Sequence, residues 1–311
     1  MKIIVVILLA GLTTGCTKYR ANEVATPQPR AEAKSNCQTQ QLADEVRQIA
    51  AVTHGPVGAA FELLETKESA FIEGQQHFPM QSVYKFPIAI LVLREVDARK
   101  FSLDQLIAVK PADFVSDREF TISRNYPQGA ELSLRDLLRY MISESDGTAC
   151  DVLLRLIGGP QKATSSLRAL GVENINIARY EKEMFETPSV ASENWTTPET
   201  AIALLKLFQE GKVLSPGSHD LLLNLMIQSR PGKKRIKGLL PEGTVVAHKT
   251  GTSATINGVT TATNDIGLIT LPGGRQLAIA VFVSDTKADE KTREAVIAKI
   301  AVAGWKCWSQ K

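Results

Sequence analysis

Residues 244–283 read TVVAHKTGTSATINGVTTATNDIGLITLPGGRQLAIAVFV. Three runs within this stretch are rich in Val, Ile and Thr, at 244–252, 265–271 and 276–283, and such runs favour β-strands. The turn signal Pro-Gly-Gly at 272–274 separates the last two runs. We therefore predict that the C-terminal third of the chain contributes three strands to one antiparallel sheet.

Two more strands are predicted near the N-terminus, at 57–64 and 70–73. An amphipathic helix over 41–51 precedes them, and a helix from about residue 287 to the end of the chain follows the last strand. Strands from both ends can share one sheet, with the helical middle inserted between them. The predicted fold class is α/β (α+β): an antiparallel five-stranded sheet flanked by helices plus an inserted all-helical subdomain.

Helical signals dominate the middle of the chain. Ser133 followed by Asp136 resembles a capping box, and Thr197 before Pro198 predicts another helix start. Apolar residues at helical spacing define one helix face: Leu134, Leu137, Leu138, Met141 and Ile142. The predicted boundaries are 36–78 and 229–311 for an α/β subdomain and 79–228 for an all-α subdomain.

The N-terminus has the pattern of an export signal over residues 1–16. Lys2 precedes an apolar segment of about ten residues, which is too short to span a bilayer as a structural helix. Small residues then precede Cys16, as in bacterial lipoprotein signals. Two outcomes stay open, lipidation of Cys16 or plain cleavage nearby. Both predict an exported, periplasmic protein that contacts a membrane at most through a lipid, and the polar residues 17–35 are predicted to be a linker.

The composition is that of an ordinary globular protein, with 44% hydrophobic and 22% charged residues. The net charge is +3, and no dense Lys/Arg run predicts a nucleic-acid partner. Neither Cys-x-x-Cys nor His-Glu-x-x-His occurs, so we expect no metal and no cofactor. Cys37, Cys150 and Cys307 follow the predicted signal and allow at most one disulfide.

Ser82 and Lys85 are three residues apart in the sequence Ser-Val-Tyr-Lys. On a helix this spacing brings the hydroxyl and the amine to the same side, within hydrogen-bond reach. A serine hydroxyl becomes a good nucleophile when a neighbour takes its proton. A lysine can do this in its neutral form, which burial or nearby positive charge favours. The tetrapeptide alone is a weak signal, because it occurs often by chance.

Two further patterns gain meaning in combination with Ser82. The sequence Lys-Thr-Gly at 249–251 ends a strongly β run and can place a cation beside the nucleophile, but alone it describes an ordinary exposed strand lysine. The sequence Ser-Asp-Gly at 145–147 lies between two predicted helices, where its serine can relay a proton to a leaving nitrogen. Alone, this second pattern describes a plain helix N-cap.

The order and approximate spacing of the three patterns resemble the signature of class A β-lactamases and penicillin-binding proteins. The resemblance to class A serine β-lactamases, and among them to the extended-spectrum subgroup of the VEB and PER enzymes, covers essentially all of residues 37–311. The other matching segments are 143–146, 150–151, 156–159, 179–181, 194–198, 246–253 and 263–265. The resemblance implies a hydrolase that opens penicillins and cephalosporins through an acyl-enzyme on Ser82 and so confers antibiotic resistance.

The same resemblance implies roles for further residues. Glu181 would act through a bound water as the general base for deacylation, and whether it or Lys85 is the base for acylation is disputed in class A enzymes. Taken alone, Glu181 is a solvated glutamate in a loop, the Ω-loop at about 178–196. The backbone N–H groups of Ser82 and Thr252 would form the oxyanion hole. The implied substrate-binding residues are Lys249, Thr250, Gly251, Thr252, Arg235, Gly147 and Phe120.

Four residues depart from the class A pattern. Gly147 stands where most members have an asparagine that binds the substrate side chain. Phe185 stands where many have an asparagine, and the VEB and PER enzymes a histidine, that positions the deacylating water. Asn194 replaces an aspartate that usually pairs with the arginine at Arg179, so we expect the loop to be held differently. Lys182 replaces a common proline. We expect these changes to affect the turnover rate more than the reaction type.

The resemblance also implies that the first and last helices pack antiparallel, which brings Cys37 near Cys307. A disulfide between them would close a loop of about 270 residues, which entropic models value at about 4–5 kcal/mol. Cys150 is then expected to be a small buried residue. We expect a monomer whose partners are a small-molecule β-lactam and a catalytic water.

Two other functions share the three patterns. A DD-peptidase, or another penicillin-binding protein, acts on peptidoglycan stems but lacks a deacylation base such as Glu181. A slow-turnover β-lactam-binding protein stays acylated, and Phe185 agrees with that behaviour. A Ser-His-Asp hydrolase is disfavoured, because the sequence contains no Gly-x-Ser-x-Gly.

Overall fold

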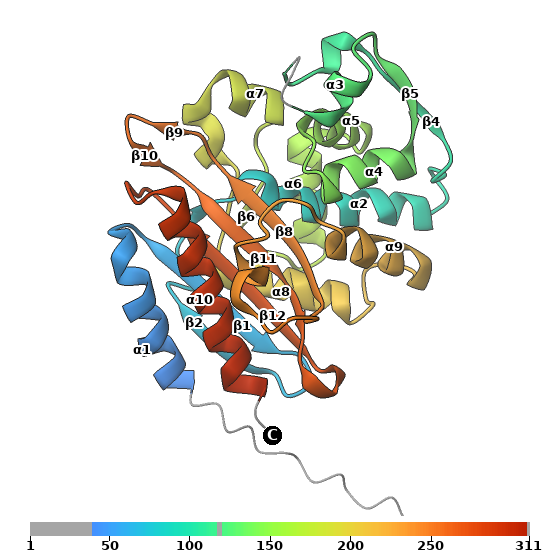
Figure 1. The fold of residues 1–311 in the computed structure, drawn as a ribbon. Coiled ribbons are helices and arrows are strands. Elements are labelled where there is room, and N and C mark those ends of the chain that lie inside the picture. Colours follow the sequence, from blue (N-terminus) through green and yellow to red (C-terminus); the bar gives the residue numbers. More distant parts are fainter. Residues whose placement is uncertain (1–38, 117–119, 310–311) are drawn as a thin grey trace, which may run out of the picture. The chain divides into compact units, whose positions relative to one another are not determined.

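Five strands form one sheet in the computed structural model, which describes residues 39–116 and 120–309. They are β1 (Val57–Leu63), β2 (Glu68–Ile72), β8 (Val246–Thr252), β11 (Thr263–Thr270) and β12 (Gln276–Val283). Every pairing is antiparallel, in the order β2-β1-β12-β11-β8 (Figure 1). The predicted fold class is confirmed, because strands from both ends of the chain pair in this sheet and the helical block lies between them in the sequence.

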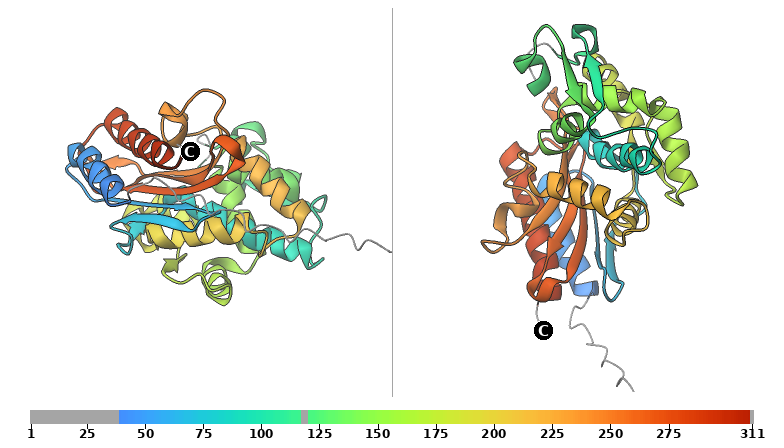
Figure 2. Two further views of the ribbon diagram at one scale, coloured as in Figure 1. Left: turned by 90° about the horizontal axis from the view of Figure 1, so that it is seen from below. Right: turned by 90° about the vertical axis from the view of Figure 1, so that its right-hand side faces the viewer.

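The central strand β12 is apolar on both faces. Its alternating residues belong to two buried clusters, Leu277, Ile279, Val281 and Val283 to one and Ala278, Ala280 and Phe282 to the other. The helices α1 (Thr39–Ala50) and α10 (Glu290–Ser309) cover the first face, and α8 (Pro198–Gln209) with the inserted helices covers the second (Figure 2). A strand covered on both faces reads as a continuous apolar run, which is what the sequence shows.

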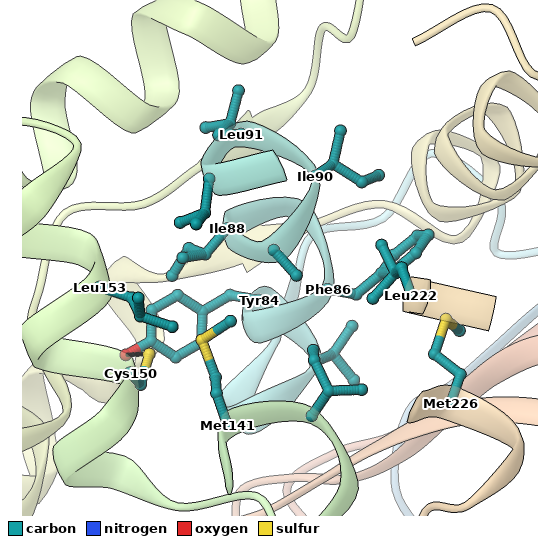
Figure 3. Packing of buried hydrophobic residues seen from close by; sticks show 14 of the residues in the cluster. Tyr84, Phe86, Ile88, Ile90, Leu91, Met141, Cys150, Leu153, Leu222 and Met226 are labelled. Carbon is teal, nitrogen blue, oxygen red and sulfur yellow. Dashed lines mark hydrogen bonds between the residues drawn. The ribbon is translucent and has the colours of Figure 1, made fainter. Parts of the chain in front are cut away.

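The helix α2 (Lys85–Asp97) lies in the centre of the helical block, and every residue from Lys85 to Leu93 is buried. A helix that is apolar all round is typical of a protein core. Side chains from α4 (Leu134–Ser143), α5 (Gly147–Leu156) and α9 (Pro216–Ile227) pack around it (Figure 3). The first turn of a tightly packed helix therefore carries Lys85.

Predicted caps begin two helices. The Ser133 Oγ atom accepts the N–H of Asp136 at 3.0 Å at the start of α4. The Thr197 Oγ1 atom accepts the N–H of Thr200 at 3.2 Å, one residue before Pro198 opens α8. All five predicted apolar residues of α4 are buried, which confirms the periodicity argument.

Some boundaries differ from the sequence prediction. The strand β8 begins at Val246 rather than residue 244, because its pairing with β11 starts with Val246 opposite Ile269. The helix α10 begins at Glu290 rather than about residue 287, because the Asp289 carboxylate accepts the N–H of Thr292 at 2.7 Å and so caps the helix there.

A small three-stranded sheet brings both ends of the Ω-loop to the segment before Ser82. Its order is β3-β7-β6, where β6 (Ile175–Asn176) precedes the loop, β7 (Trp195–Thr196) forms its last residues and β3 (Phe78–Pro79) leads to Ser82. The other short strands are β4 (Leu106–Val109), β5 (Ala130–Ser133), β9 (Thr255–Ile256) and β10 (Val259–Thr260). The other α-helices are α3 (Thr121–Asn125), α6 (Gly159–Ala169) and α7 (Glu181–Glu186).

The described residues belong to one unit. The predicted division into subdomains at residues 79 and 229 stays a prediction. The predicted signal and linker, with Cys16 and Cys37, lie outside the described residues. Over the described ranges, no helix is long and apolar enough to cross a bilayer.

Candidate functional site

Ser82 and Lys85 lie side by side where the 3-10 turn η2 (Gln81–Tyr84) runs into α2. The Lys85 Nζ atom donates to Ser82 Oγ at 2.9 Å and to the Ser145 carbonyl oxygen at 2.8 Å. The Lys85 side chain is fully buried. Gln81, just before the serine, has a φ of 46°, which is a strained conformation for a residue other than glycine. Strain of this kind is common where a protein fixes a reactive group.

Glu181 points toward the same pair. Its Oε1 atom lies 3.2 Å from Lys85 Nζ, and its side chain is only 13% exposed, so it is not a solvated loop residue. Glu181 is the first residue of α7, and the N–H groups of Glu181 and Lys182 donate to the Asp151 carboxylate at 2.7 and 2.9 Å. A carboxylate is a favourable partner for the free N–H groups at a helix start. Burial, followed by the Glu181 charge, raises the pKa of Asp151 to about 7.

Lys249 lies on β8 and reaches Ser145. Its Nζ atom donates to Ser145 Oγ at 2.9 Å and to the Thr250 carbonyl oxygen at 3.1 Å. Lys249 is fully buried, so the alternative of an exposed strand lysine is wrong. Burial, followed by the positive charge of Lys85, lowers the pKa of Lys249 to about 7. Ser145 therefore lies between two lysines, its carbonyl facing one and its hydroxyl the other.

The residue after Ser145 also has the structural role that the sequence allowed. The Asp146 carboxylate accepts the N–H of Ala149 at 2.9 Å and so caps α5. Its second oxygen accepts the N–H of Ile122 at 2.9 Å, which ties α3 to the same turn. Asp146 therefore caps the helix, while its neighbour Ser145 contacts the lysines.

Arg235 is buried beside the end of β8. Its Nη2 atom donates to Thr252 Oγ1 at 2.7 Å, and its Nε atom pairs with Glu294 at 3.2 Å. Its Nη1 atom donates to the carbonyl oxygens of Gly251 and Asn264 at 3.2 and 3.0 Å. The guanidinium therefore fixes the strand end and holds the Thr252 hydroxyl at the edge of the site.

Phe120 and Gly147 are in contact next to Lys85 and Glu181. The Phe120 ring centre lies 6.0 Å from Lys85 Nζ. A Cβ atom built on Gly147 would lie 2.9 Å from Phe120 Cζ and 3.3 Å from Glu181 Oε2. The aromatic ring therefore takes up space that a side chain at position 147 would need.

The Ω-loop is closed by an asparagine rather than by an arginine–aspartate pair. The Asn194 Oδ1 atom accepts the N–H groups of Ala178 and Arg179 at 2.7 and 2.9 Å, and its Nδ2 atom donates to the Arg179 carbonyl oxygen at 3.0 Å. The Arg179 side chain turns instead to Glu193 at 2.8 Å and to Glu183 at 3.3 Å. A fully buried amide thus joins the two ends of the loop by bonds to its backbone.

The other two departures lie on α7. Phe185 is 47% exposed, and Lys182 Nζ donates to the Ala112 carbonyl oxygen at 3.0 Å. Lys182 thereby joins the loop to the helical block by a bond that proline cannot make.

The described cysteines differ in state. Cys307 is disulfide-bonded, and its predicted partner Cys37 lies outside the described residues, so the pairing stays a prediction. Cys150 is free and fully buried, as expected, and its Sγ atom lies 3.3 Å from the Tyr84 hydroxyl (Figure 3).

Sequence reasoning named the polar groups at the centre of this site but missed the carboxylate that holds Glu181. Asp151 lies in a segment that the resemblance covers, yet nothing in the sequence joins it to backbone groups 30 residues away. The assembled site contains a buried hydroxyl–amine pair, a carboxylate 3.2 Å from the amine and a second lysine bonded to Ser145 Oγ. Such a site can activate a serine, stabilise negative charge and deprotonate a water.

Comparison with known proteins agrees with this geometry. The sequence pattern of the "Beta-lactamase enzyme family" matches residues 41–308. The chain is 37% identical to "Beta-lactamase VEB-1" of Pseudomonas aeruginosa, over 89% of this chain and 93% of that enzyme. It is 39% identical to "Extended-spectrum beta-lactamase PER-1" of the same organism, over 86% and 87%. A β-lactamase crystal structure from Chitinophaga pinensis superimposes with a TM-score of 0.84 at 44% identity, over 86% and 98%.

Proposed function

The chain belongs to the β-lactamase enzyme family, and on this premise we propose that it hydrolyses β-lactam antibiotics through an acyl-enzyme on Ser82 and so confers resistance to them. The observation that best supports this proposal is that one buried amine, Lys85 Nζ, lies 2.9 Å from Ser82 Oγ and 3.2 Å from Glu181 Oε1. Nucleophile, proton acceptor and deacylation base are thus within reach of one another.

In acylation, Ser82 Oγ attacks the carbonyl carbon of the β-lactam ring. Its proton goes to Lys85, or through a water to Glu181. The ring C–N bond then breaks, and the nitrogen takes a proton from the Ser145 hydroxyl, which regains one from Lys249 Nζ at 2.9 Å. Because Ser145 Oγ accepts a hydrogen bond from Lys249, its own O–H is free to donate. The N–H groups of Ser82 and Thr252 would stabilise the oxyanion, an effect worth about 10²–10³ in rate for a single donor.

In deacylation, Glu181 takes a proton from a water whose oxygen attacks the ester carbon. The bond from that carbon to Ser82 Oγ breaks, and a proton returns to the serine. Asp151 keeps the start of α7 in place through the N–H groups of Glu181 and Lys182. The substrate carboxylate would bind Lys249 and the Thr252 hydroxyl, which Arg235 orients, along the strand edge formed by Thr250 and Gly251.

Turnover of a chromogenic cephalosporin tests this function. Purified enzyme should cleave many equivalents of nitrocefin, and the Ser82→Ala variant should cleave none above background. A single burst of one equivalent would favour the slow-turnover binding protein instead. No cleavage, with release of terminal D-alanine from a peptidoglycan stem peptide, would favour a DD-peptidase.

We further propose that the protein is exported to the periplasm and acts as a monomer. The export-signal pattern of residues 1–16 supports the first part. Mass spectrometry of the mature protein separates lipidation of Cys16 from plain cleavage, and light scattering reports the oligomeric state. Non-reducing peptide mapping tests the pairing of Cys307 with Cys37.

A further inference from the structure

The two proposed oxyanion-hole donors come from segments far apart in the chain. The Ser82 N–H belongs to the turn η2, and the Thr252 N–H belongs to the last residue of β8. Backbone donors stabilise an oxyanion only when both are aimed at one point, about 3 Å away. Some contact must therefore fix the distance between the turn and the strand.

The strand touches the turn directly at Gly251. A Cβ atom built on Gly251 would collide with the Met80 carbonyl oxygen and would lie 3.1 Å from Gln81 Cβ and 3.2 Å from Ser82 N. A close approach of two backbones is a common reason for glycine in a strand. Without a side chain between them, however, this contact supplies no bond that holds the turn in place.

Asn264 supplies that bond from the neighbouring strand. It lies on β11 directly opposite Gly251. Its Nδ2 atom donates to the Pro79 carbonyl oxygen at 2.8 Å and to the Met80 carbonyl oxygen at 3.1 Å. Both carbonyls lie within three residues of Ser82, so one amide is hydrogen-bonded to the segment that leads to the nucleophile.

The opposite end of this amide has no partner. Asn264 is fully buried, and its Oδ1 atom makes no hydrogen bond. The amide cannot be reversed, because its oxygen would then face two carbonyl oxygens, and an amide oxygen cannot donate. A buried acceptor without a partner destabilises the folded state. Such a cost is easier to understand where the donor end has a function.

Arg235 holds the same strand pair through its backbone. Its Nη1 atom donates to the carbonyl oxygens of Asn264 and Gly251. The strand pair is therefore fixed by a guanidinium, and its asparagine side chain fixes the turn. The left-handed backbone at Gln81, with a φ of 46°, lies between the two carbonyls that Asn264 bonds and Ser82. A strained turn of this kind persists only where surrounding contacts hold it.

We propose that Asn264 is a positioning residue for the oxyanion hole, which sets the distance between the N–H groups of Ser82 and Thr252 by hydrogen-bonding the Pro79 and Met80 carbonyls. This inference rests on the proposed acyl-enzyme on Ser82. It assigns Asn264 to the oxyanion hole and not to substrate binding or to Ω-loop closure.

The acyl carbonyl itself reports on the hole. Hydrogen bonds from the two N–H groups weaken its C=O bond and lower its infrared stretching frequency. Glu181→Ala provides a background in which the adduct persists, and ¹³C labelling of the β-lactam carbonyl identifies the band. In this background, Asn264→Ala should raise the stretching frequency. It should also slow acylation by about 10- to 100-fold, an effect no larger than that of removing one oxyanion-hole donor. The substrate Kd should change little.

Asn194→Ala is the matched control, because Asn194 is also a fully buried asparagine whose Nδ2 atom bonds a backbone carbonyl. In the same background it should leave the acyl carbonyl frequency unchanged. If Asn264→Ala does not fold, Asn264→Ser, which keeps one hydroxyl donor, should show a smaller shift in the same direction.

The outcomes separate the two claims. An unshifted band and unchanged acylation in a folded Asn264 variant would overturn the role of Asn264 while leaving the acyl-enzyme intact. An equal shift in the Asn194 variant would also overturn it, because the effect would then be general loosening. No adduct on Ser82 in the Glu181→Ala parent, together with no nitrocefin turnover by the wild-type enzyme, would refute the proposed function instead.

Discussion

The two halves of the site are held in different ways. Ser82, Lys85 and Ser145 come from helix starts, and Lys249 comes from the edge strand β8, all of them packed against the core of the molecule. Glu181 is carried by a short helix in a loop, and buried polar side chains hold that loop. Core packing thus holds most of the groups that act in acylation, with Asn264 fixing the turn before Ser82, whereas the deacylation base depends on hydrogen bonds to its loop. Single substitutions among the residues that hold the loop should therefore slow deacylation while leaving acylation nearly unchanged.

Asp151→Ala should slow deacylation, and we expect this to be a larger effect than those of Lys249 titration and of Gly147→Ala. It leaves the N–H groups of Glu181 and Lys182 without their acceptor and frees the start of α7. Because a positioned base contributes about 10²–10⁴ in rate, we expect deacylation to slow by about 10- to 100-fold. Acylation should change by less than about 3-fold, because the Ser82–Lys85 pair has other supports. Stopped-flow kinetics should show a burst followed by slow turnover, and an equal loss in both steps would contradict the comparison.

Lys249 should make substrate binding depend on pH. Its pKa is lowered to about 7, so it loses its proton as pH rises through 7 and the site loses a positive charge. We expect the KM for a carboxylate-bearing β-lactam to rise about 3- to 10-fold between about pH 6.5 and 8.5, since only the protonated amine binds a carboxylate strongly. Lys249→Arg is the control, because its guanidinium stays protonated over this range. The same KM profile in both enzymes would rule out Lys249 as the titrating group.

The contact between Gly147 and Phe120 should have the smallest effect. A Cβ at position 147 would lie 2.9 Å from the ring, so Gly147→Ala must displace Phe120. We expect kcat/KM to change by about 2- to 5-fold, as for neighbouring residues with a coupling energy of about 0.5–1 kcal/mol. Adding Phe120→Ala should remove most of the effect of Gly147→Ala. Additive effects in this double-mutant cycle would mean that the two residues act separately.

The sequence predicted the sheet and most helices because their patterns are local. The apolar run at 276–283, the face of Leu134 to Ile142 and the proline after Thr197 each depend on residues within a few positions. Boundaries were less certain where pairing decides them. Val245 has β-favouring chemistry, yet it lies outside β8 and is 47% exposed.

The polar groups of the site were also predictable, because the three short patterns resemble a known signature. Their supports were not, because each joins residues distant in the chain. Asn264 contacts Pro79 across 185 positions, and Asp151 contacts Glu181 across 30. The altered closure by Asn194 was expected in kind, but only coordinates place its amide between Ala178 and Arg179.

The most direct test of the account is the fate of the adduct in Glu181→Ala. After mixing with a cephalosporin, intact-protein mass spectrometry should find the acyl group on Ser82 for many wild-type turnover times, because the water lacks its base. The wild-type enzyme should return to its free mass once substrate is exhausted. Free Glu181→Ala enzyme within one wild-type turnover time would contradict the account.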